Sequence, residues 1–255
     1  MGLTITSRNA RFQQWQALLT NRTKRHRAGE FIVQGVRPIS LAVQHGWEIR
    51  ALLHRHGGAL SKWAVELLDT VDTTHVAMAD ELLAELGEQE ETPELVAVVA
   101  QRADDPKRIA PGLVVVFDRP VSPGNVGMLI RSADAFGATG VVVTGHSADI
   151  YDPRAVRAST GSLFALPVVR LDRYQTKGFV IGLDEHGSLE LADVDLRGPT
   201  TLVVGNETHG LSANWRDACD VLARIPIGGA ASSLNAAAAG SIALYEVARQ
   251  RSIQG

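Results

Sequence analysis

The stretch Thr201–Ser212 reads T-L-V-V-G-N-E-T-H-G-L-S, and it predicts a buried strand that runs directly into a polar turn. The apolar run 202–204 is typical of a strand that is covered on both faces. Gly205 and Gly210 bracket four polar residues, so the turn presents their side chains at the carboxyl end of this strand. Open α/β sheets bind ligands at that end of their strands, and we therefore expect a ligand site here.

A second stretch, 224–246, supplies the other side of this site. It reads R-I-P-I-G-G-A-A-S-S-L-N-A-A-A-A-G-S-I-A-L-Y-E and follows an apolar run that begins at Val221. Ser232 or Ser233 is the expected N-cap of a helix that begins at Ala236 and continues to about residue 251. Loops at the ends of two strands and the N-terminus of a helix would together form a concave site lined by backbone groups.

A third stretch lies at 113–137, where a predicted strand and a loop with prolines and a glycine lead into a helix. The helix is expected to begin at Asn125, to continue to residue 136 and to end at Gly137. Asn125 is a good N-cap, which would be its ordinary structural role. Arg131 stands on an otherwise apolar helix, where a guanidinium needs either a carboxylate partner or an anionic ligand. The sequence leaves both alternatives open for Arg131.

These stretches contain N-V-G-M-L-I-R at 125–131, G-N-E-T-H-G-L at 205–211 and S-L-N at 233–235. In this order and spacing they resemble the three motifs of the SpoU/TrmH family of RNA ribose 2'-O-methyltransferases, and the likeness extends over the whole chain. The resemblance implies an α/β catalytic domain with a SPOUT-type parallel sheet and a trefoil knot. It also implies S-adenosylmethionine as cofactor, 23S ribosomal RNA as substrate, and resistance to a ribosome-targeting antibiotic of the avilamycin type.

The same resemblance assigns roles to individual residues. The catalytic residues that it implies are Asn125, Arg131, Glu207, Ser233 and Asn235. The residues that it implies for cofactor binding are Leu183, Gly205, Asn206, Gly210, Ile225, Ile227 and Leu234. Ala236 and Ala237 stand where the family usually has valine and serine, and Ile227 replaces the usual methionine. We expect these departures to change the packing around the adenosyl group without removing a function.

Length and composition give the domain organisation. The chain has 255 residues, of which 45% are hydrophobic, which suffices for two domains with real cores. The polar stretch 101–112 is the best linker, and the predicted domains are 1–105 and 106–255. No apolar run approaches the ~18 residues of a membrane span, and no signal pattern opens the chain, which predicts a cytoplasmic protein.

Cysteine and histidine usage argues against a metal centre. Cys219 is the single cysteine, and neither His146 nor His186 has a partner at metal-ligand spacing, so we expect no disulfide and no bound metal. A helix is predicted at 153–159 and a strand at 179–183. The loop 182–187 (G-L-D-E-H-G) follows that strand and could still contact a ligand.

The charge of the chain is unevenly distributed. Residues 1–60 contain nine Lys/Arg and two Glu, whereas the rest contains sixteen basic and 26 acidic residues. This asymmetry suggests that the first part of the chain meets a polyanion. It alternates predicted helices and strands, from a helix at 5–20 to a strand at 95–100. This part resembles the ribosomal-protein-like RNA-binding domain that precedes many SpoU/TrmH catalytic domains. We expect its basic turn 21–29 to bind RNA phosphates through Arg22, Lys24, Arg25 and Arg27.

Two alternatives to a ribosomal RNA methyltransferase stay open. One is a transfer RNA 2'-O-methyltransferase with the same chemistry, and the other is a non-catalytic RNA-binding factor that keeps the fold. A site made from loops and one helix end would be shallow, and the family resemblance implies that a second subunit completes it. We therefore expect a homodimer.

Overall fold

The computed structural model describes residues 3–87 and 92–252, and the chain divides into two compact units. Unit 1 comprises Met1–Arg102 and Tyr151–Ala165, and unit 2 comprises Ala103–Ile150 and Leu166–Gly255. The compact units differ from the predicted ranges 1–105 and 106–255 in one respect. The segment Tyr151–Ala165, from the second half of the sequence, packs with unit 1.

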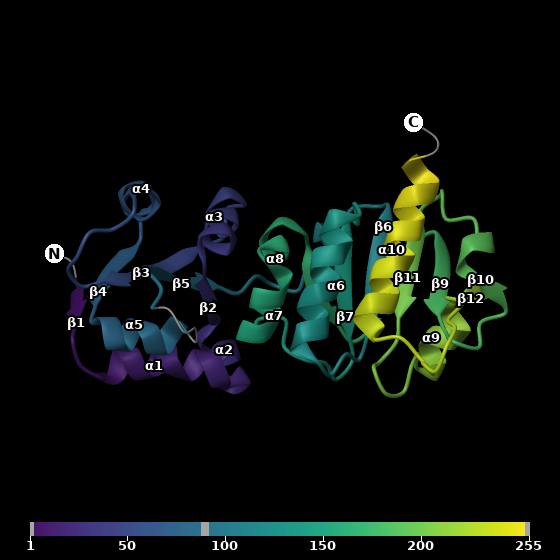
Figure 1. The fold of residues 1–255 in the computed structure, drawn as a ribbon, viewed down its shortest axis with the longest axis horizontal. Helices are drawn as coiled ribbons and strands as arrows, with labels where there is room; N and C mark the ends of the chain where they lie inside the picture. Colours follow the sequence, from purple (N-terminus) through teal and green to yellow (C-terminus); the bar gives the residue numbers. More distant parts are fainter. Residues whose placement is uncertain (1–2, 88–91, 253–255) are drawn as a thin grey trace. The chain divides into compact units, whose positions relative to one another are not determined.

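Unit 1 is built on a mixed five-stranded sheet. Its strands, in spatial order, are β1 (Leu3–Ile5), β4 (Thr74–Met78), β3 (Ile49–Arg55), β5 (Leu95–Ala100) and β2 (Glu30–Gln34). Strands β1, β4 and β3 are parallel, whereas β5 is antiparallel to both of its neighbours. One face carries α1 (Ala10–Thr20) and α5 (Asp80–Gly87), and the other carries α3 (Val36–Gln44) and α4 (Lys62–Thr70), as Figure 1 shows.

The beginning of unit 1 differs from the prediction. The sequence favoured one helix from residue 5 to residue 20, but β1 comes first and α1 begins after Asn9, whose side chain accepts a hydrogen bond from Phe12 N at 3.0 Å. The stretch 21–29 was predicted as a basic turn and is the helix α2 (Arg22–Ala28). Asn21 caps it and Gly29 ends it at φ 64°, which is a left-handed conformation that suits glycine.

An aromatic cluster joins the segment Tyr151–Ala165 to unit 1. The segment forms α7 (Pro153–Ser159) and α8 (Ser162–Ala165), of which the sequence predicted only the first. Tyr151 and Phe164 stack on the buried Phe31, with ring centroids 4.6 and 6.2 Å from it. Trp47 donates a hydrogen bond through Nε1 to the carbonyl of Phe164 at 3.0 Å. This contact between distant parts of the sequence explains why the domain boundary was incompletely predicted.

Unit 2 contains a seven-stranded parallel sheet, which confirms the predicted α/β class. Its strands, in spatial order, are β10 (Leu189–Glu190), β12 (Val221–Arg224), β9 (Phe179–Leu183), β11 (Thr200–Val204), β6 (Leu113–Asp118), β7 (Gly140–Thr144) and β8 (Val168–Leu171). The predicted strand Leu202–Val204 is the end of β11, which lies between β9 and β6. The strands β9, β11 and β12 therefore end near one another at one edge of the sheet.

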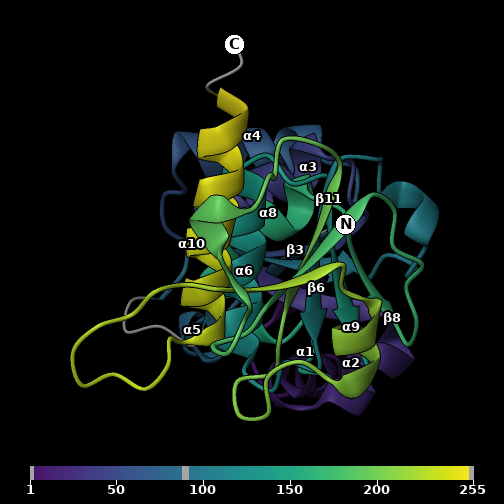
Figure 2. The same ribbon diagram turned by 90° about the vertical axis from the view of Figure 1, so that its right-hand side faces the viewer.

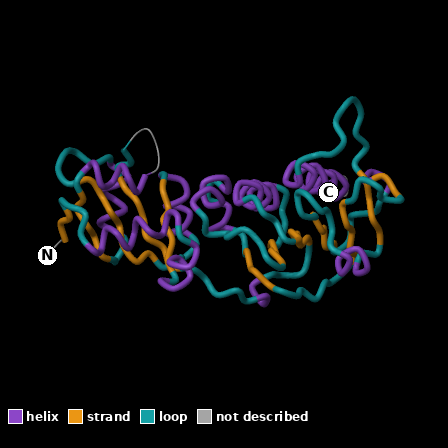
Figure 3. The backbone as a smooth tube through the Cα atoms, turned by 90° about the horizontal axis from the view of Figure 1, so that it is seen from below, coloured by secondary structure: helices purple, strands orange, loops and turns teal. Residues whose placement is uncertain are grey.

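Two helices cover one face of this sheet. Helices α6 (Pro123–Ala135) and α10 (Ala236–Ser252) pack side by side against it (Figure 1). Their contact is close because Gly240 has no side chain: a Cβ there would lie 2.5 Å from Leu129 and 3.2 Å from Val204. Ser132 and Ser241 share a hydrogen bond of 2.7 Å between the helices. The loop 225–235 that leads into α10 projects away from the sheet (Figures 2 and 3).

The opposite face of the sheet is covered mainly by loops. Val114, Val116 and Val203 form its apolar layer together with Trp215, which stands on the short helix α9 (Ala213–Ala218). The connection 172–178 must cross this layer, since β8 is an edge strand and β9 lies beyond β11. The linker contributes a single 3₁₀ turn, Pro106–Arg108. Within residues 3–87 and 92–252, none of the helices has the length and apolar character needed to span a membrane.

Candidate active site

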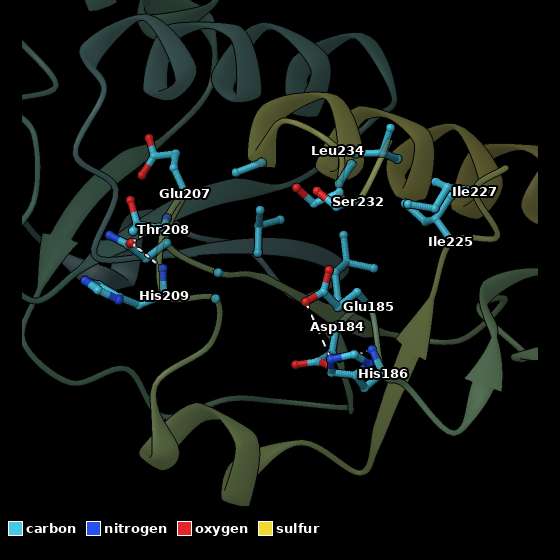
Figure 4. A pocket seen from close by; sticks show the side chains of 18 of the residues that line it. Asp184, Glu185, His186, Glu207, Thr208, His209, Ile225, Ile227, Ser232 and Leu234 are labelled. Carbon is cyan, nitrogen blue, oxygen red and sulfur yellow. Dashed lines mark hydrogen bonds and ion pairs between the residues drawn. The ribbon is translucent and has the colours of Figure 1, made fainter. Parts of the chain in front are cut away.

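A cavity of about 420 Å³ lies at the carboxyl ends of β9, β11 and β12. The loops after these strands and the N-terminus of α10 surround it, as Figure 4 shows. All seven residues predicted for cofactor binding line this cavity: Leu183, Gly205, Asn206, Gly210, Ile225, Ile227 and Leu234. Its volume lies within the range of roughly 300–1,000 Å³ that small-molecule sites span.

The turn after β11 needs glycine at both of its ends. A Cβ on Gly205 would lie 2.4 Å from the carbonyl carbon of Gly210, and Gly210 has a φ of 63°. Asn206 and Gly210 exchange two backbone hydrogen bonds of 3.0 Å. The Asn206 side chain closes the turn, because its Oδ1 accepts hydrogen bonds from Thr208 N and His209 N at 2.9 and 3.0 Å. The polar turn therefore presents backbone groups to the cavity in a fixed conformation.

Asp118 and Arg119 form a partly buried ion pair that was not predicted from the sequence, and this pair contacts the turn 205–210. Asp118 is 2% exposed, and its carboxylate accepts two hydrogen bonds of 3.1 Å from Arg119 and one of 2.8 Å from Ser212 N. Arg119 adopts a φ of 51° and donates to the carbonyl of Gly210 at 3.2 Å. Its own carbonyl accepts a hydrogen bond of 2.6 Å from Asn206 Nδ2. Arg119, whose backbone is strained, therefore forms two hydrogen bonds with the turn 205–210.

Three predicted catalytic residues form one hydrogen-bonded chain. Asn235 donates through Nδ2 to Asn125 Oδ1 at 3.1 Å, and Asn125 donates through Nδ2 to Glu207 Oε1 at 3.0 Å. Glu207 also accepts hydrogen bonds from the backbone N–H groups of Val121 and Ser122 at 2.9 and 3.0 Å. The three motifs recognised in the sequence are therefore in contact through these side chains.

The caps of the two helices differ from the prediction. Ser122, not Asn125, is the N-cap of α6, with Pro123 in its first turn, and Ser122 Oγ accepts from Asn125 N at 3.3 Å. Asn235 takes the place predicted for Ser232 or Ser233, because its Oδ1 accepts from Ala237 N and Ala238 N at 3.0 and 3.2 Å. Proline at the start of α6 moves the helix start two residues upstream. The amide of Asn125 is thereby left to bind Glu207.

The environment of Glu207 makes its carboxylate a weak base. Burial raises the pKa of Glu207, but hydrogen bonds from Val121 N, from the Asn125 amide and from Ser122 N outweigh this effect. The pKa of Glu207 consequently lies below its ordinary value of 4.5. Both oxygens already accept hydrogen bonds, so Glu207 is better suited to holding the loop 120–125 against the turn than to accepting a proton.

Arg131 is exposed and stands apart from this chain of hydrogen bonds. Glu207 and Ser233 line the cavity, whereas Asn125, Asn235 and Arg131 lie outside its wall. Within residues 3–87 and 92–252, the Arg131 side chain has neither a hydrogen bond nor a carboxylate partner. Of the two alternatives that the sequence left open, an ion pair within the described chain is therefore absent. The Arg131 guanidinium faces solvent, where an anionic ligand can reach it.

The cavity wall also contains charged residues without an assigned role. Asp184, Glu185 and His186 belong to the loop 182–187, which lines the cavity, so its contact with a ligand stays a prediction. Arg216 pairs with Asp184 at 2.6 Å and comes from α9, a helix that was not predicted from the sequence. Its role depends on tertiary contacts and had no local sequence signal. In the described part of the chain, no three His, Cys, Asp or Glu side chains come together as metal ligands.

One of the four residues predicted to bind RNA, all of which lie on α2, is buried. Arg22, Lys24 and Arg27 are exposed on α2, as expected. Arg25 is only 2% exposed and donates through Nη1 to the carbonyls of Leu18 and Leu19 at 2.7 and 3.3 Å. It also lies 3.7 Å from the carboxylate of Asp152. Arg25 therefore caps the C-terminal carbonyls of α1 and is not available to RNA.

The fold and the site place this chain in a known family. The model of the SpoU L30e-like domain matches residues 9–97, and that of the SpoU rRNA Methylase family matches residues 112–245. The chain belongs to the SpoU rRNA methylase family.

Individual relatives extend this finding over almost the whole chain. The 23S rRNA (uridine(2479)-2'-O)-methyltransferase of Streptomyces viridochromogenes is 57% identical over 264 aligned positions, which cover 97% of this chain and 92% of that protein. The crystal structure of the SpoU methyltransferase AviRb from the same organism, in complex with AdoMet, has a TM-score of 0.91 at 56% identity and covers 97% of this chain and all (100%) of its own. The AdoMet-bound rRNA methyltransferase from Sinorhizobium meliloti has a TM-score of 0.83 at 28% identity and covers 96% of this chain and 97% of its own.

Proposed function

We propose that this protein transfers a methyl group from S-adenosylmethionine to a ribose 2'-hydroxyl of 23S ribosomal RNA. One observation carries the proposal: the seven residues implied for cofactor binding line one cavity at the strand ends, and the chain Asn235–Asn125–Glu207 joins one residue from each of the three motifs. The relative from Streptomyces viridochromogenes is named for this reaction at a uridine of 23S rRNA. We further propose, from the family resemblance of the motifs, that the methylation confers resistance to an antibiotic of the avilamycin type.

The residues around the cavity fit S-adenosylmethionine. Leu183, Ile225 and Leu234 offer apolar surface to an adenine ring, and the turn 205–210 offers backbone N–H and C=O groups. The exposed carboxylate of Glu185 lines the same cavity and complements a positively charged sulfonium or ammonium group, whereas Asp184 is already paired with Arg216. When bound, the cofactor supplies a methyl group that is already activated on sulfur.

The protein's own contribution is positioning and charge. Glu207 holds the loop before α6 against the cofactor turn and, through Asn125 and Asn235, fixes the N-terminus of α10. Arg131 is free to bind the phosphate next to the target ribose and to stabilise the oxyanion as the 2'-hydroxyl loses its proton. With both Glu207 oxygens occupied, we assign the proton to water rather than to that carboxylate.

Three further features belong to this proposal. The strand order of unit 2 supports a trefoil knot in the C-terminal segment, as in the SPOUT class. A homodimer would complete the exposed side of the cavity, and the protein would act in the cytoplasm, on ribosomal RNA. The exposed cations Arg22, Lys24 and Arg27 supply part of the affinity for that RNA.

Isothermal titration with S-adenosylmethionine, followed by methyl transfer, tests the proposal. We expect the purified protein to bind one cofactor per chain and to transfer labelled methyl to ribosomal RNA at a position that becomes resistant to alkaline cleavage. Primer extension then locates the nucleotide. Transfer to tRNA alone would assign the protein to the tRNA alternative. Cofactor binding without transfer to any RNA, or no cofactor binding, would contradict the proposed reaction.

A further inference from the structure

Most of the cations of unit 2 have partners in the structure. Its described part contains twelve Lys and Arg residues, and the side chains of eight of them bond to a carboxylate or to a backbone carbonyl. The four that do not are Arg131, Lys107, Arg173 and Lys177. Arg131 belongs to the candidate active site. The other three have no role in the chemistry described above.

These three cations surround one cavity. Lys107, Arg173 and Lys177 all line a hollow of about 490 Å³ between the linker 106–112 and the loop 171–177. All three are exposed at its rim. In the described structure the neighbouring Asp105 forms no ion pair with the Lys107 ammonium, and its carboxylate instead accepts the backbone N–H of Lys107 at 2.9 Å.

The floor of this hollow is apolar and contains an aromatic ring. Val114 and Leu171 line it, and Tyr174 packs against the apolar layer of the sheet. Burial raises the pKa of the Tyr174 hydroxyl, so the ring stays neutral at physiological pH. Within the described residues, the Tyr174 hydroxyl has no hydrogen-bond partner. A neutral aromatic ring beside unpaired cations is the combination that single-stranded nucleic acid requires.

The charge of unit 2 makes this cluster unusual. Unit 2 contains fifteen acidic and twelve basic residues, so its net charge is negative. Three unpaired cations around one hollow raise the local positive potential and attract an anionic occupant. We propose that this hollow binds a single-stranded segment of the RNA substrate, with its phosphates on Lys107, Arg173 and Lys177 and a base stacked on Tyr174. The inference rests on the proposed function, since it assumes an RNA substrate.

This site is separate from the cofactor cavity. Gly112, Pro199 and Lys177 lie just before β6, β11 and β9, whereas the cofactor cavity lies at the carboxyl ends of β9, β11 and β12. Because β9 and β11 are each five residues long, the two sites lie about 17 Å apart along these strands. The hollow therefore binds a nucleotide other than the one that is methylated, and changes in it should leave cofactor binding intact.

A pair of matched double variants tests this site. Lys107→Ala with Lys177→Ala removes two unpaired cations, and Arg197→Ala with Arg249→Ala removes two paired ones from the same unit. Filter binding of the full chain to a 23S rRNA transcript over a series of KCl concentrations gives the salt slope. We expect the first variant to bind roughly tenfold more weakly, with a slope smaller by about 1.4, because each phosphate that a cation neutralises on a single strand contributes ~0.7. The control should keep the slope of the parent protein.

A second pair of variants probes the ring, and the outcomes separate the proposals. Tyr174→Phe should keep RNA affinity, whereas Tyr174→Ala should lower it about tenfold at an unchanged salt slope. Equal slopes for the two double variants would overturn the RNA site, as would binding of adenosine monophosphate in the hollow with unchanged RNA affinity. If either of these two results is obtained while the parent protein methylates the transcript, the RNA site is wrong and the proposed function stands. If it neither binds nor methylates RNA, both proposals fail.

Discussion

At the scale of single residues, the structure redistributes the roles within the candidate active site. Glu207 is one of the catalytic residues that the resemblance implies, yet three donors occupy its carboxylate and hold its pKa below the ordinary value. The Arg131 guanidinium, by contrast, has no partner in the described residues and is exposed to solvent. The Glu207 side chain is thus held within the protein and that of Arg131 is not, a difference that their motifs alone do not show.

Glu207 should make the stability of the protein depend on pH. Because its folded-state pKa is depressed, its contribution is complete above about pH 4.5 and is lost as the pH falls through the lower folded-state pKa. Glu207→Gln places an amide donor against the N–H groups of Val121 and Ser122. We expect a loss of about 1–3 kcal/mol in the free energy of unfolding at pH 7. Urea titrations should show the difference from the parent protein shrinking in acid, whereas the exposed Glu185→Gln control changes little at either pH. A pH-independent difference would contradict this assignment.

The role of Arg131 can be separated from that of a base by Arg131→Lys. Arginine side chains in general keep their proton up to a pH of about 12, and an amine ionises near ~10.4. If position 131 removed the ribose proton, the acid limb of the pH–rate profile would move to lower pH in the lysine variant. We expect the limb to stay in place while the rate falls on the order of 100-fold, since an ammonium cannot bind a phosphate in the bidentate geometry of a guanidinium. Arg249→Lys, on the far part of α10, serves as the control. A clear downward shift of the limb would contradict the electrostatic role.

At the scale of elements, helix α2 contains two kinds of arginine. Arg22, Lys24 and Arg27 point outward, whereas Arg25 fills the space beside the end of α1. We expect the triple alanine variant of the three exposed residues to bind RNA more weakly and to unfold like the parent protein. Its salt slope should be smaller by roughly one unit for each phosphate that the variant no longer binds. Arg25→Ala should instead lower the free energy of unfolding by about 3 kcal/mol, because it leaves the buried carbonyls at the end of α1 without their donor.

Filter binding and urea unfolding of the same two variants check that the exposed cations bind RNA whereas Arg25 stabilises the fold. The opposite result, in which Arg25→Ala binds RNA poorly while remaining as stable as the parent protein, would return Arg25 to the RNA-binding surface. An unchanged salt slope in the triple variant would remove α2 from that surface. Cofactor affinity is the internal control, because both variants lie in unit 1 and the cofactor cavity lies in unit 2.

The same element shows how far the sequence predicts the structure. Strands such as Leu95–Ala100 and Phe179–Leu183 were predicted to the residue, because an apolar run between polar residues is a local signal. Helix α2 has no apolar periodicity and depends on its caps and on Arg25, so the sequence suggested a turn. In the site, the motif residues predicted the cavity wall. The Asp118–Arg119 pair and Arg216 were missed because their roles come from partners about 90 and 30 residues away.

At the scale of the whole molecule, the charge asymmetry between the first 60 residues and the rest of the sequence is not an asymmetry between the two compact units. The strongly basic first 60 residues share unit 1 with the acidic stretch 61–102, so this unit contains thirteen basic and thirteen acidic residues. RNA affinity therefore cannot come from the net charge of a domain. We expect it to come from local clusters of exposed cations, such as those on α2 and around Tyr174.

A last prediction concerns the assembly of the molecule. Met128 on α6, with Ile242 and Tyr245 on the adjacent α10, is 48%, 41% and 55% exposed, and we call these three residues the helix patch. Two packed helices that expose large apolar side chains mark an interface, and the patch adjoins the helix that carries Arg131. We expect a homodimer in which this patch is buried. Light scattering at micromolar concentration should give twice the mass of the chain. Ile242→Glu with Tyr245→Glu should give a monomer with little methyl transfer, while Val65→Glu, at an exposed apolar position in unit 1, should change neither. A stable and fully active monomer of the parent protein would show instead that one chain forms the complete site.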